Sequence, residues 1–242
     1  MSEGIDSKHI ATSGGRAGGR VGVRVFLNAL ALLVALSACS ESNDGDGSTK
    51  INGSIHVPVG RQAAAVATVN GSIHVDDGAA VTSAKTVNGS VHLGDHATAT
   101  GLNSVNGSIV LGTGAHVSGS ASSVNGDLSM GDGAEISGSL SNVNGKITLN
   151  AAHVGGGMKT VNGSMNINGA SRVEGGILVE KPSSDLLRFV RDVPRIVIGP
   201  GAAVQGDLRF ERTVQLFVSD KATIGTVIGA TPVRFSGDAP PN

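Results

Sequence analysis

Three histidines stand one repeat apart, His56, His74 and His92, each at the third position of the pattern S-I/V-H-V/L. Neutral imidazole is a common ligand for divalent metal ions, so a column of such rings could share an ion. Metal ligands converge on an ion from different directions, whereas residues at one repeat position point the same way. We therefore expect a solvent-facing strand position with no metal and no cofactor. The three histidines are the candidate ligands if a metal binds.

An Asn-Gly dipeptide marks seven repeats, within segments such as TVNGSIHV (68–75), at spacings of 18, 18, 18, 19, 19 and 18 residues. Asn and Gly tolerate positive φ, so the dipeptide predicts a tight corner. If successive repeats stack, the side-chain amides can donate and accept along the column, as in the Asn ladders of cross-β assemblies. The asparagines of this structural ladder are Asn52, Asn70, Asn88, Asn106, Asn125, Asn144 and Asn162.

Other residues capable of chemistry are scattered. His96, His116 and His153 fall at unrelated positions of the repeat, and the carboxylates stand mostly beside turn glycines. Acid–base catalysis on a sugar needs acids and bases gathered on one face of a cleft. The formal net charge of −1 gives no electrostatic footprint for nucleic acid. We expect no enzyme and no nucleic-acid partner.

The elements that position these residues are short strands. Apolar residues recur every six positions, as at Val69, Val75 and Val81, and a second apolar row, including Ile55 and Ile73, lies two residues before some members of the first. SIHV alternates with the period of a half-buried strand, and no stretch has helical periodicity. An 18-residue coil with three short strands and three turns predicts an all-β, single-stranded parallel β-helix of about nine coils.

The solenoid is predicted over 51–235, followed by a disordered tail at 236–242. The segment 181–194, KPSSDLLRFVRDVP, breaks the repeat and predicts a loop ejected from the solenoid. Loops on a rigid scaffold often carry function. The apolar residues of this loop could dock a partner, or they could fold back over an apolar edge of the solenoid. These partner-binding candidates are Leu186, Leu187, Phe189 and Val190.

Residues 1–38 have the features of a secretory signal, with three arginines before the apolar run 25–38. The stretch LSAC at 36–39 resembles the lipobox of bacterial lipoproteins, and Cys39 is the only cysteine. The resemblance implies loss of 1–38 and acylation of Cys39, including palmitate. Ser40 after the cysteine implies sorting to the outer membrane. Residues 39–50 then form the lipidated cysteine and a flexible polar tether. An ordinary signal peptide with an incidental cysteine is the alternative.

The VNGSIHV repeats resemble those of DUF4097-type adhesin domains of bacteria. The segments LGTGAHVSGS (111–120) and IGPGAAVQGDL (198–208) resemble the turns of bactofilins, which are polymer-forming bacterial β-helix proteins. The resemblance spans about 51–230 and implies a right-handed coil. Parallel crossovers generally have the same hand. The six-residue rows equally allow a left-handed helix of the hexapeptide acyltransferase kind. Bactofilins mostly lack a secretory signal, so the N-terminal segment departs from that family.

These observations predict a lipid-anchored β-helical protein of the bacterial cell envelope with a structural, scaffold or adhesin-like binding role. Its expected partners are the membrane, through the lipid anchor, and an envelope glycan or protein. The alternative is a bactofilin-like filament that self-associates through its coil ends. A carbohydrate-active enzyme is the third interpretation.

Overall fold

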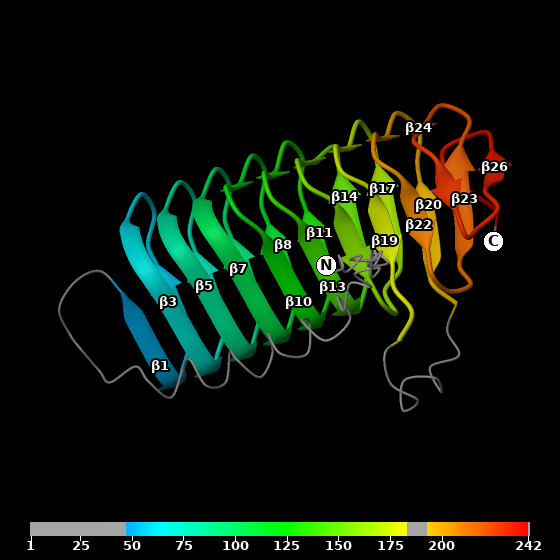
Figure 1. Cartoon of the computed structure of the whole chain (residues 1–242). Coiled ribbons are helices and arrows are strands. Elements are labelled where there is room, and N and C mark those ends of the chain that lie inside the picture. The colour runs from blue at the N-terminus through cyan, green and yellow to red at the C-terminus, as the bar shows by residue number, and fades with distance from the viewer. Residues whose placement is uncertain (1–46, 183–192, 242) are drawn as a thin grey trace, which may run out of the picture.

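The computed structural model describes residues 47–182 and 193–241, and these residues form an elongated stack of strands without a helix (Figure 1). The strands pair in parallel with partners one repeat away, for example His56 with His74. The predicted single-stranded parallel β-helix is confirmed. One sheet holds ten strands, one for each coil, so the solenoid has about ten coils where the sequence predicted about nine.

This ten-stranded sheet carries the SIHV segments and their equivalents. Its strands, in spatial order, are β2 (Ile55–Val57), β4 (Ile73–Val75), β6 (Val91–Leu93), β8 (Ile109–Leu111), β11 (Leu128–Met130), β14 (Ile147–Asn150), β17 (Met165–Asn168), β20 (Arg195–Ile198), β23 (Gln215–Ser219) and β26 (Val233–Phe235). The inward side chains of these strands, such as Ile73 and Val75, are fully buried.

The second sheet has sixteen strands and divides into two branches after its fourth strand. The undivided part is β1 (Ser48–Asn52), β3 (Gln62–Asn70), β5 (Ala80–Asn88) and β7 (Thr98–Asn106). One branch is β9 (His116–Val117), β12 (Glu135–Ile136), β15 (His153–Val154), β18 (Arg172–Val173), β21 (Ala203–Val204) and β24 (Thr223–Ile224). The other is β10 (Ala121–Asn125), β13 (Leu140–Asn144), β16 (Met158–Thr160), β19 (Ile177–Val179), β22 (Leu208–Phe210) and β25 (Val227–Ile228).

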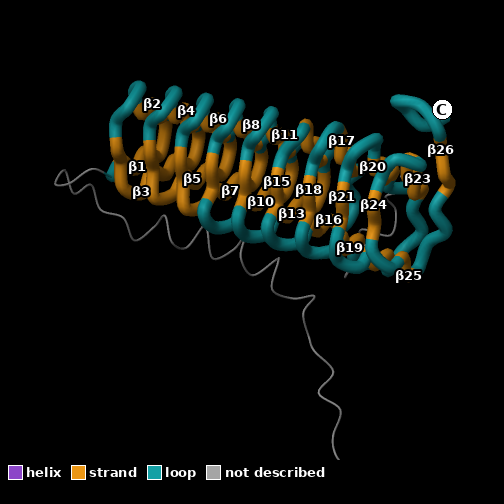
Figure 2. The backbone as a smooth tube through the Cα atoms, turned by 90° about the horizontal axis from the view of Figure 1, so that it is seen from above, coloured by secondary structure: helices purple, strands orange, loops and turns teal. Residues whose placement is uncertain are grey.

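The division has a local cause. The start of β7 pairs Thr98 with His116, whereas its end pairs Leu102 with Ala121, which is one position farther along the chain than the first register requires. The extra residue therefore lies in the 118–120 turn, which separates β9 from β10. The prediction of three strands per coil was wrong for the first coils, in which β3, β5 and β7 each run unbroken for nine residues, and it holds from β8 onward (Figure 2).

The two ends of the solenoid differ from their predicted bounds. Strand β1 begins at Ser48, so the expected tether to residue 50 is too long by three residues. At the other end, within the expected disordered tail, the carbonyl of Pro241 accepts a hydrogen bond of 2.9 Å from Nη2 of Arg195. The Arg195 guanidinium also lies 4.8 Å from the ring centroid of Phe217. The phenylalanines of the described residues all lie in the last coils.

The core is a set of apolar columns, and the Val of VNG is less buried than its predicted row. Val69 and Val105 are only half-buried and Val87 and Val143 are buried at 7%, whereas the preceding Thr68 and Ser104 are almost fully buried. Alternation along a strand turns neighbouring residues to opposite faces, so the inward position at this corner belongs to Thr68 and its equivalents. A polar column therefore lines this part of the interior.

One turn of each coil contains a residue with left-handed backbone geometry. Most coils use Gly there, for example Gly133 with φ of 67°, but two use other residues, His96 with φ of 57° and Ala151 with φ of 44°. A Cβ at such φ angles meets backbone atoms of its own residue and costs roughly 1–2 kcal/mol. These two turns are consequently strained relative to the others.

We expect Ala151→Gly to raise the free energy of unfolding by about 1 kcal/mol, because Gly adopts positive φ at little steric cost. The control is Gly133→Ala, where an added Cβ meets no atom closer than 3.9 Å, so the backbone angle alone acts. It should lower stability by a similar amount. Urea unfolding followed by far-UV circular dichroism measures both changes, and a loss of stability in Ala151→Gly would contradict the strain.

Candidate functional site

The seven corner asparagines lie in one column along the solenoid. Each Nδ2 donates to the Oδ1 of the asparagine in the preceding coil, over 2.8–3.0 Å, from Asn70 to Asn52 through to Asn162 and Asn144. The amides therefore form one unidirectional chain of hydrogen bonds, in which each bond polarises the next. Most of these side chains are exposed, so the ladder lies along an outer edge of the rod and not in its core.

The ladder ends on an arginine. Nη1 of Arg212 donates to Oδ1 of Asn162 and, over 3.0 Å, to the carbonyl of Val161. Because Val179 pairs with Phe210, Arg212 stands opposite Lys181, in the same column as the asparagines. The repeat breaks at 181–194, so the column has no further Asn-Gly corner there. Instead, a long cationic side chain reaches back from a later coil and satisfies the last oxygen of the chain.

From Gly71 onward, the glycine of each corner is required by close stacking. A Cβ on Gly71 would lie 2.3 Å from the carbonyl oxygen of Gly53, and a Cβ on Gly89 would lie 2.0 Å from that of Gly71. Such distances are far inside van der Waals contact, and the atom met belongs to the backbone. Any other residue would push the coils apart at this corner.

The residue after the glycine also bonds to its neighbouring coil. Its side-chain oxygen accepts a hydrogen bond from the backbone N–H of the equivalent residue one coil later. The pairs run from Ser54 with Ser72, through Ser72 with Ser90, Ser90 with Ser108, Ser108 with Asp127 and Asp127 with Lys146, at 2.8–3.2 Å. Ser164 accepts in the same way from Arg195, at 3.1 Å. The side chains replace carbonyls where the corner interrupts the backbone ladder.

A further polar column lies inside the corner and was missed by the sequence analysis. In five of the seven corners, the residue two positions before the Asn is buried and donates to the carbonyl of the corner glycine in the preceding coil. These bonds are Thr68 to Gly53, Thr86 to Gly71, Ser104 to Gly89, Ser123 to Gly107 and Asn142 to Gly126, at 2.9–3.1 Å. Recurrence of a hydroxyl residue at this position was the signal, and it was masked by the assumption that the adjacent Val faces inward.

Asn142 fits this column less well than a hydroxyl residue. Its Nδ2 replaces the hydroxyl donor, but its Oδ1 is buried and has no hydrogen-bond partner among the described residues. An unpaired buried acceptor costs roughly 1–3 kcal/mol. The column therefore tolerates an amide while favouring Thr or Ser.

The three histidines of the SIHV segments point outward and do not converge. The rings of His74 and His92 stack with centroids 4.8 Å apart, while Nε2 of His56 lies 2.7 Å from Oδ2 of Asp76. No group of three or more His, Cys, Asp or Glu side chains in 47–182 and 193–241 has the geometry to hold a metal ion. Within those ranges the column offers a stack of rings and one ion pair.

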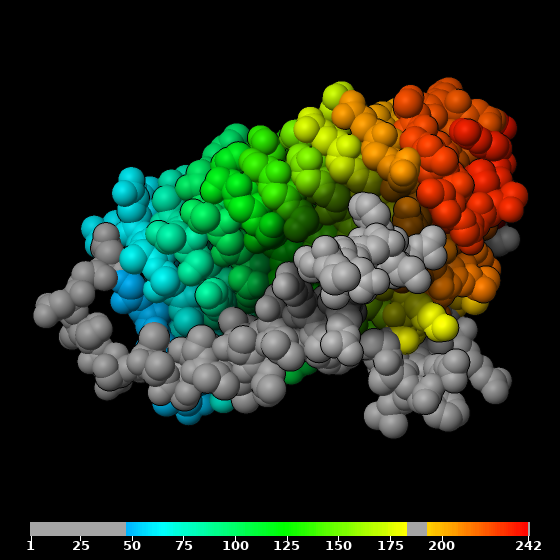
Figure 3. Space-filling model, in the orientation of Figure 1, coloured from blue at the N-terminus to red at the C-terminus, as the bar shows by residue number. Residues whose placement is uncertain are grey.

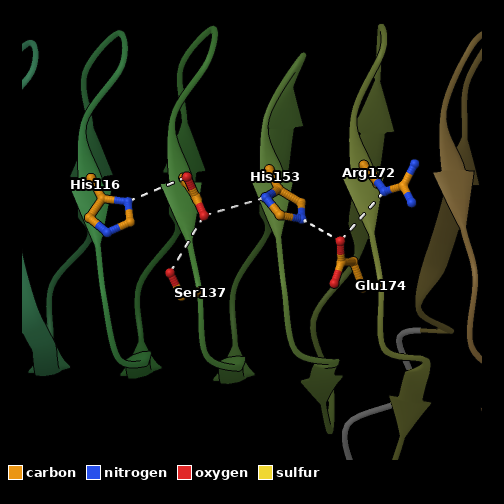
Figure 4. A network of polar contacts seen from close by, with 6 residues as sticks. His116, Ser137, His153, Arg172 and Glu174 are labelled. Carbon is orange, nitrogen blue, oxygen red and sulfur yellow. Dashed lines mark hydrogen bonds and ion pairs between the residues drawn. The ribbon is translucent and has the colours of Figure 1, made fainter.

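A second column of titratable residues was wrongly dismissed as unrelated positions. His116, Glu135, His153 and Arg172 are register partners on β9, β12, β15 and β18 (Figure 4). The carboxylate of Glu135 lies 3.4 Å from His116 Nδ1 and 3.6 Å from His153 Nδ1, and Glu174 joins His153 to Arg172 at 3.2 and 3.7 Å. The longer spacing that brings His116 opposite Glu135 hid this register, because the extra residue lies in a neighbouring turn. These side chains are 35–52% exposed, so each pair contributes little to stability.

The open N-terminal end contains a hollow of about 260 Å³. Its lining includes the apolar side chains of Ile55 and Val66 and the cationic residues Lys50 and Arg61. Strands β1 and β2 are edge strands, bonded on one side only. This end combines apolar surface, positive charge and unpaired backbone groups.

Some predicted residues lie outside the described ranges. They are Cys39 and the four apolar residues of the expected loop, Leu186, Leu187, Phe189 and Val190. Among the described residues, no helix is long and apolar enough to span a membrane. In comparisons with known proteins, no family model, no curated protein and no solved structure matches this chain. The resemblances to lipoproteins, DUF4097-type domains and bactofilins stay predictions.

Thr86→Val tests the inner polar column. The variant keeps the shape of a fully buried side chain but leaves the Gly71 carbonyl without its hydroxyl donor, so we expect a loss of roughly 1–3 kcal/mol in the free energy of unfolding. The control is Thr98→Val at an exposed strand position, where the change should stay within about 0.5 kcal/mol. Equal effects in the two variants, measured by urea unfolding, would refute the column's role.

Asn106→Ala interrupts the outer ladder by removing its bonds to Asn88 and Asn125. Because these amides are exposed, we expect a smaller loss than for Thr86→Val, about 1 kcal/mol. Asn150→Ala is the matched control, since this exposed asparagine has a single side-chain bond of 3.4 Å to Asn168. Thermal unfolding measures both losses of stability, and a larger loss in Asn150→Ala than in Asn106→Ala would contradict the contribution of the ladder.

Proposed function

We propose that this protein is a rigid β-solenoid rod of the bacterial cell envelope, anchored to the outer membrane by acyl chains on Cys39. Its role is that of a scaffold or an adhesin-like surface, without enzymatic activity. The rod would present its outward strand positions to an envelope glycan or protein.

The observation that carries this proposal is that the recurring residues of the repeat contact the neighbouring coils. The hydroxyl residue, Asn, Gly and Ser of T-V-N-G-S are all directed at the neighbouring coil, as in Thr68–Ser72. A sequence that repeats a set of coil-to-coil contacts specifies a regular rod of stated length. Such a rod suits display or spacing better than chemistry at a single site.

The shape of the described surface supports the same interpretation. The turns in 51–167 are short, and the charged column from His116 to Arg172 is spread along the rod without gathering around a cleft (Figure 4). Outward positions of the SIHV strands are polar or small in many coils, for example Ser129 and Thr148. Flat polar faces suit repetitive ligands such as glycans.

The second candidate function is a filament formed by end-to-end stacking. Both ends of the solenoid carry edge strands, β1 and β2 at one end and β24, β25 and β26 at the other. Unpaired edges are templates for pairing with another chain. A head-to-tail contact of this kind does not close and would generate a filament.

The anchor is tested by Cys39→Ala in the bacterial host. If acyl chains hold the protein, the variant should move almost completely from the membrane fraction to the soluble fraction, because a protein without its acyl chains loses this anchoring energy. Cys39→Ser should behave identically, and Ser40→Ala, which keeps the acylated residue, should stay membrane-bound. Retention of Cys39→Ala on membranes that resist a salt wash would exclude a lipid anchor.

Electron microscopy of the purified full chain in detergent separates the two candidates. Discrete rods of roughly 43 Å, nine steps of about 4.8 Å between ten coils, favour display. Filaments that lengthen with protein concentration favour self-assembly.

A further inference from the structure

We propose that the N-terminal end of the solenoid is a membrane-contacting surface, which meets anionic phospholipid headgroups through its first coil. The inference rests on the proposed acylation of Cys39 and adds to it an orientation and a second point of contact. The described residues at this end carry it through their position, their exposed apolar side chains, their charge and their open edges.

The first coil lies close along the chain to the proposed acyl anchor. Eight residue steps separate Cys39 from Gly47, where the described structure begins. A fully extended chain spans at most about 3.6 Å per residue, which limits the separation to about 29 Å. The first coil therefore cannot move far from the acyl chains. The last coil, at the opposite end of the rod, lies roughly 43 Å farther along if the rod stands upright (Figure 3).

The two most exposed large apolar side chains of the described residues lie on this first coil. Ile51 and Val59 are 72% and 69% exposed. In the last coils Val233, Val193 and Ile228 are 50%, 42% and 40% exposed. Apolar side chains at the boundary between headgroups and acyl chains gain free energy from burial. The end nearest the anchor thus has the side chains suited to this boundary.

The cations of the first coil also suit contact with an anionic lipid surface. Between residues 47 and 75 the chain contains two cations, Lys50 and Arg61, and no carboxylate; the first is Asp76. The three carboxylates of the segment 40–46 precede this range and lie outside the described residues. The first coil thus has two cations, while the Asp76 carboxylate of the second coil contacts its His56 over 2.7 Å. Each Lys or Arg near an anionic lipid surface contributes about 1 kcal/mol of attraction.

The hollow at the N-terminal end and its open strand edges present groups that contact with lipid headgroups would cover. Ile55 and Val66 line it beside the two cations, and the edge strands β1 and β2 present backbone groups that no neighbouring coil satisfies. Water and headgroups supply donors and acceptors for these groups, while a hydrocarbon interior would not. The N-terminal end is therefore suited to the headgroup layer of the membrane, into which the exposed side chains of Ile51 and Val59 would insert. Contact of this kind leaves the N-terminal edge unavailable for end-to-end stacking.

The test uses the full lipidated protein in vesicles that contain phosphatidylglycerol and a headgroup-nitroxide lipid. Cys39 is the only cysteine and its thiol is acylated, so Val59→Cys and Val233→Cys each provide one site for a fluorophore. We expect at least threefold stronger quenching at 59 than at 233. Equal quenching, or stronger quenching at 233, would overturn the proposal.

Two further readouts separate the causes of failure. Flotation with the vesicles reports the anchor: a protein that does not float overturns anchor and orientation together, while flotation with equal quenching overturns the orientation alone. Lys50→Glu with Arg61→Glu should reduce quenching at 59 at least twofold, whereas Arg209→Glu, an exposed arginine on β22, should not. If quenching at 59 instead falls as protein concentration rises, a second copy covers this end and the proposal is wrong.

Discussion

Uniform spacing between coils is the constraint on which this structure depends. Parallel strands bond only at about 4.8 Å, so every part of a coil, corners included, must fit that height. At the Asn-Gly corner the backbone of Gly89 approaches the carbonyl of Gly71 so closely that a Cβ would be 2.0 Å from it. A single larger residue there would separate two coils and strain the ladders of both sheets. Gly is thus fixed by the height of the stack.

The same constraint explains why polar side chains are so regular. A corner interrupts the backbone ladder, and its free carbonyls and N–H groups need partners within the same height. The buried hydroxyl of Thr86 meets one carbonyl, and the Ser72 hydroxyl meets one N–H. Each contact repeats because its partner repeats. Where the repeat ends, a different residue must supply the last bond, and the Arg212 guanidinium does so at the end of the Asn ladder.

Much of the fold followed from the sequence, because a fixed period and Asn-Gly turns leave few architectures for an all-β chain. The interior phase did not follow: Val69 was expected inside, although Thr68 occupies that position. Hydrophobicity alone predicts that Val69 is buried and that Thr68 faces solvent. It takes no account of the Gly53 carbonyl, which accepts a hydrogen bond from the buried Thr68 hydroxyl. The charged column was hidden for another reason. His116 and Glu135 stand one residue farther apart than the shorter repeat would place them, and their register depends on which turn holds the extra residue.

These limits indicate where function can be located in such a molecule. Residues directed at neighbouring coils cannot contact a ligand without weakening the stack, which leaves the outward strand positions and the two ends. In the outward column that runs from His116 to Arg172, Glu135 contacts the imidazoles of His116 and His153, and Glu174 contacts His153 and Arg172, so these groups already have partners within the column. At the first coil, Lys50 and Arg61 lie beside the open edge, while His56 contacts the Asp76 carboxylate. At the first coil apolar exposure and positive charge coincide on open strands, and an end differs from the walls because it occurs once in the chain. Because the walls repeat nearly identical coils, contact through one end is what can fix the orientation of the rod relative to a surface.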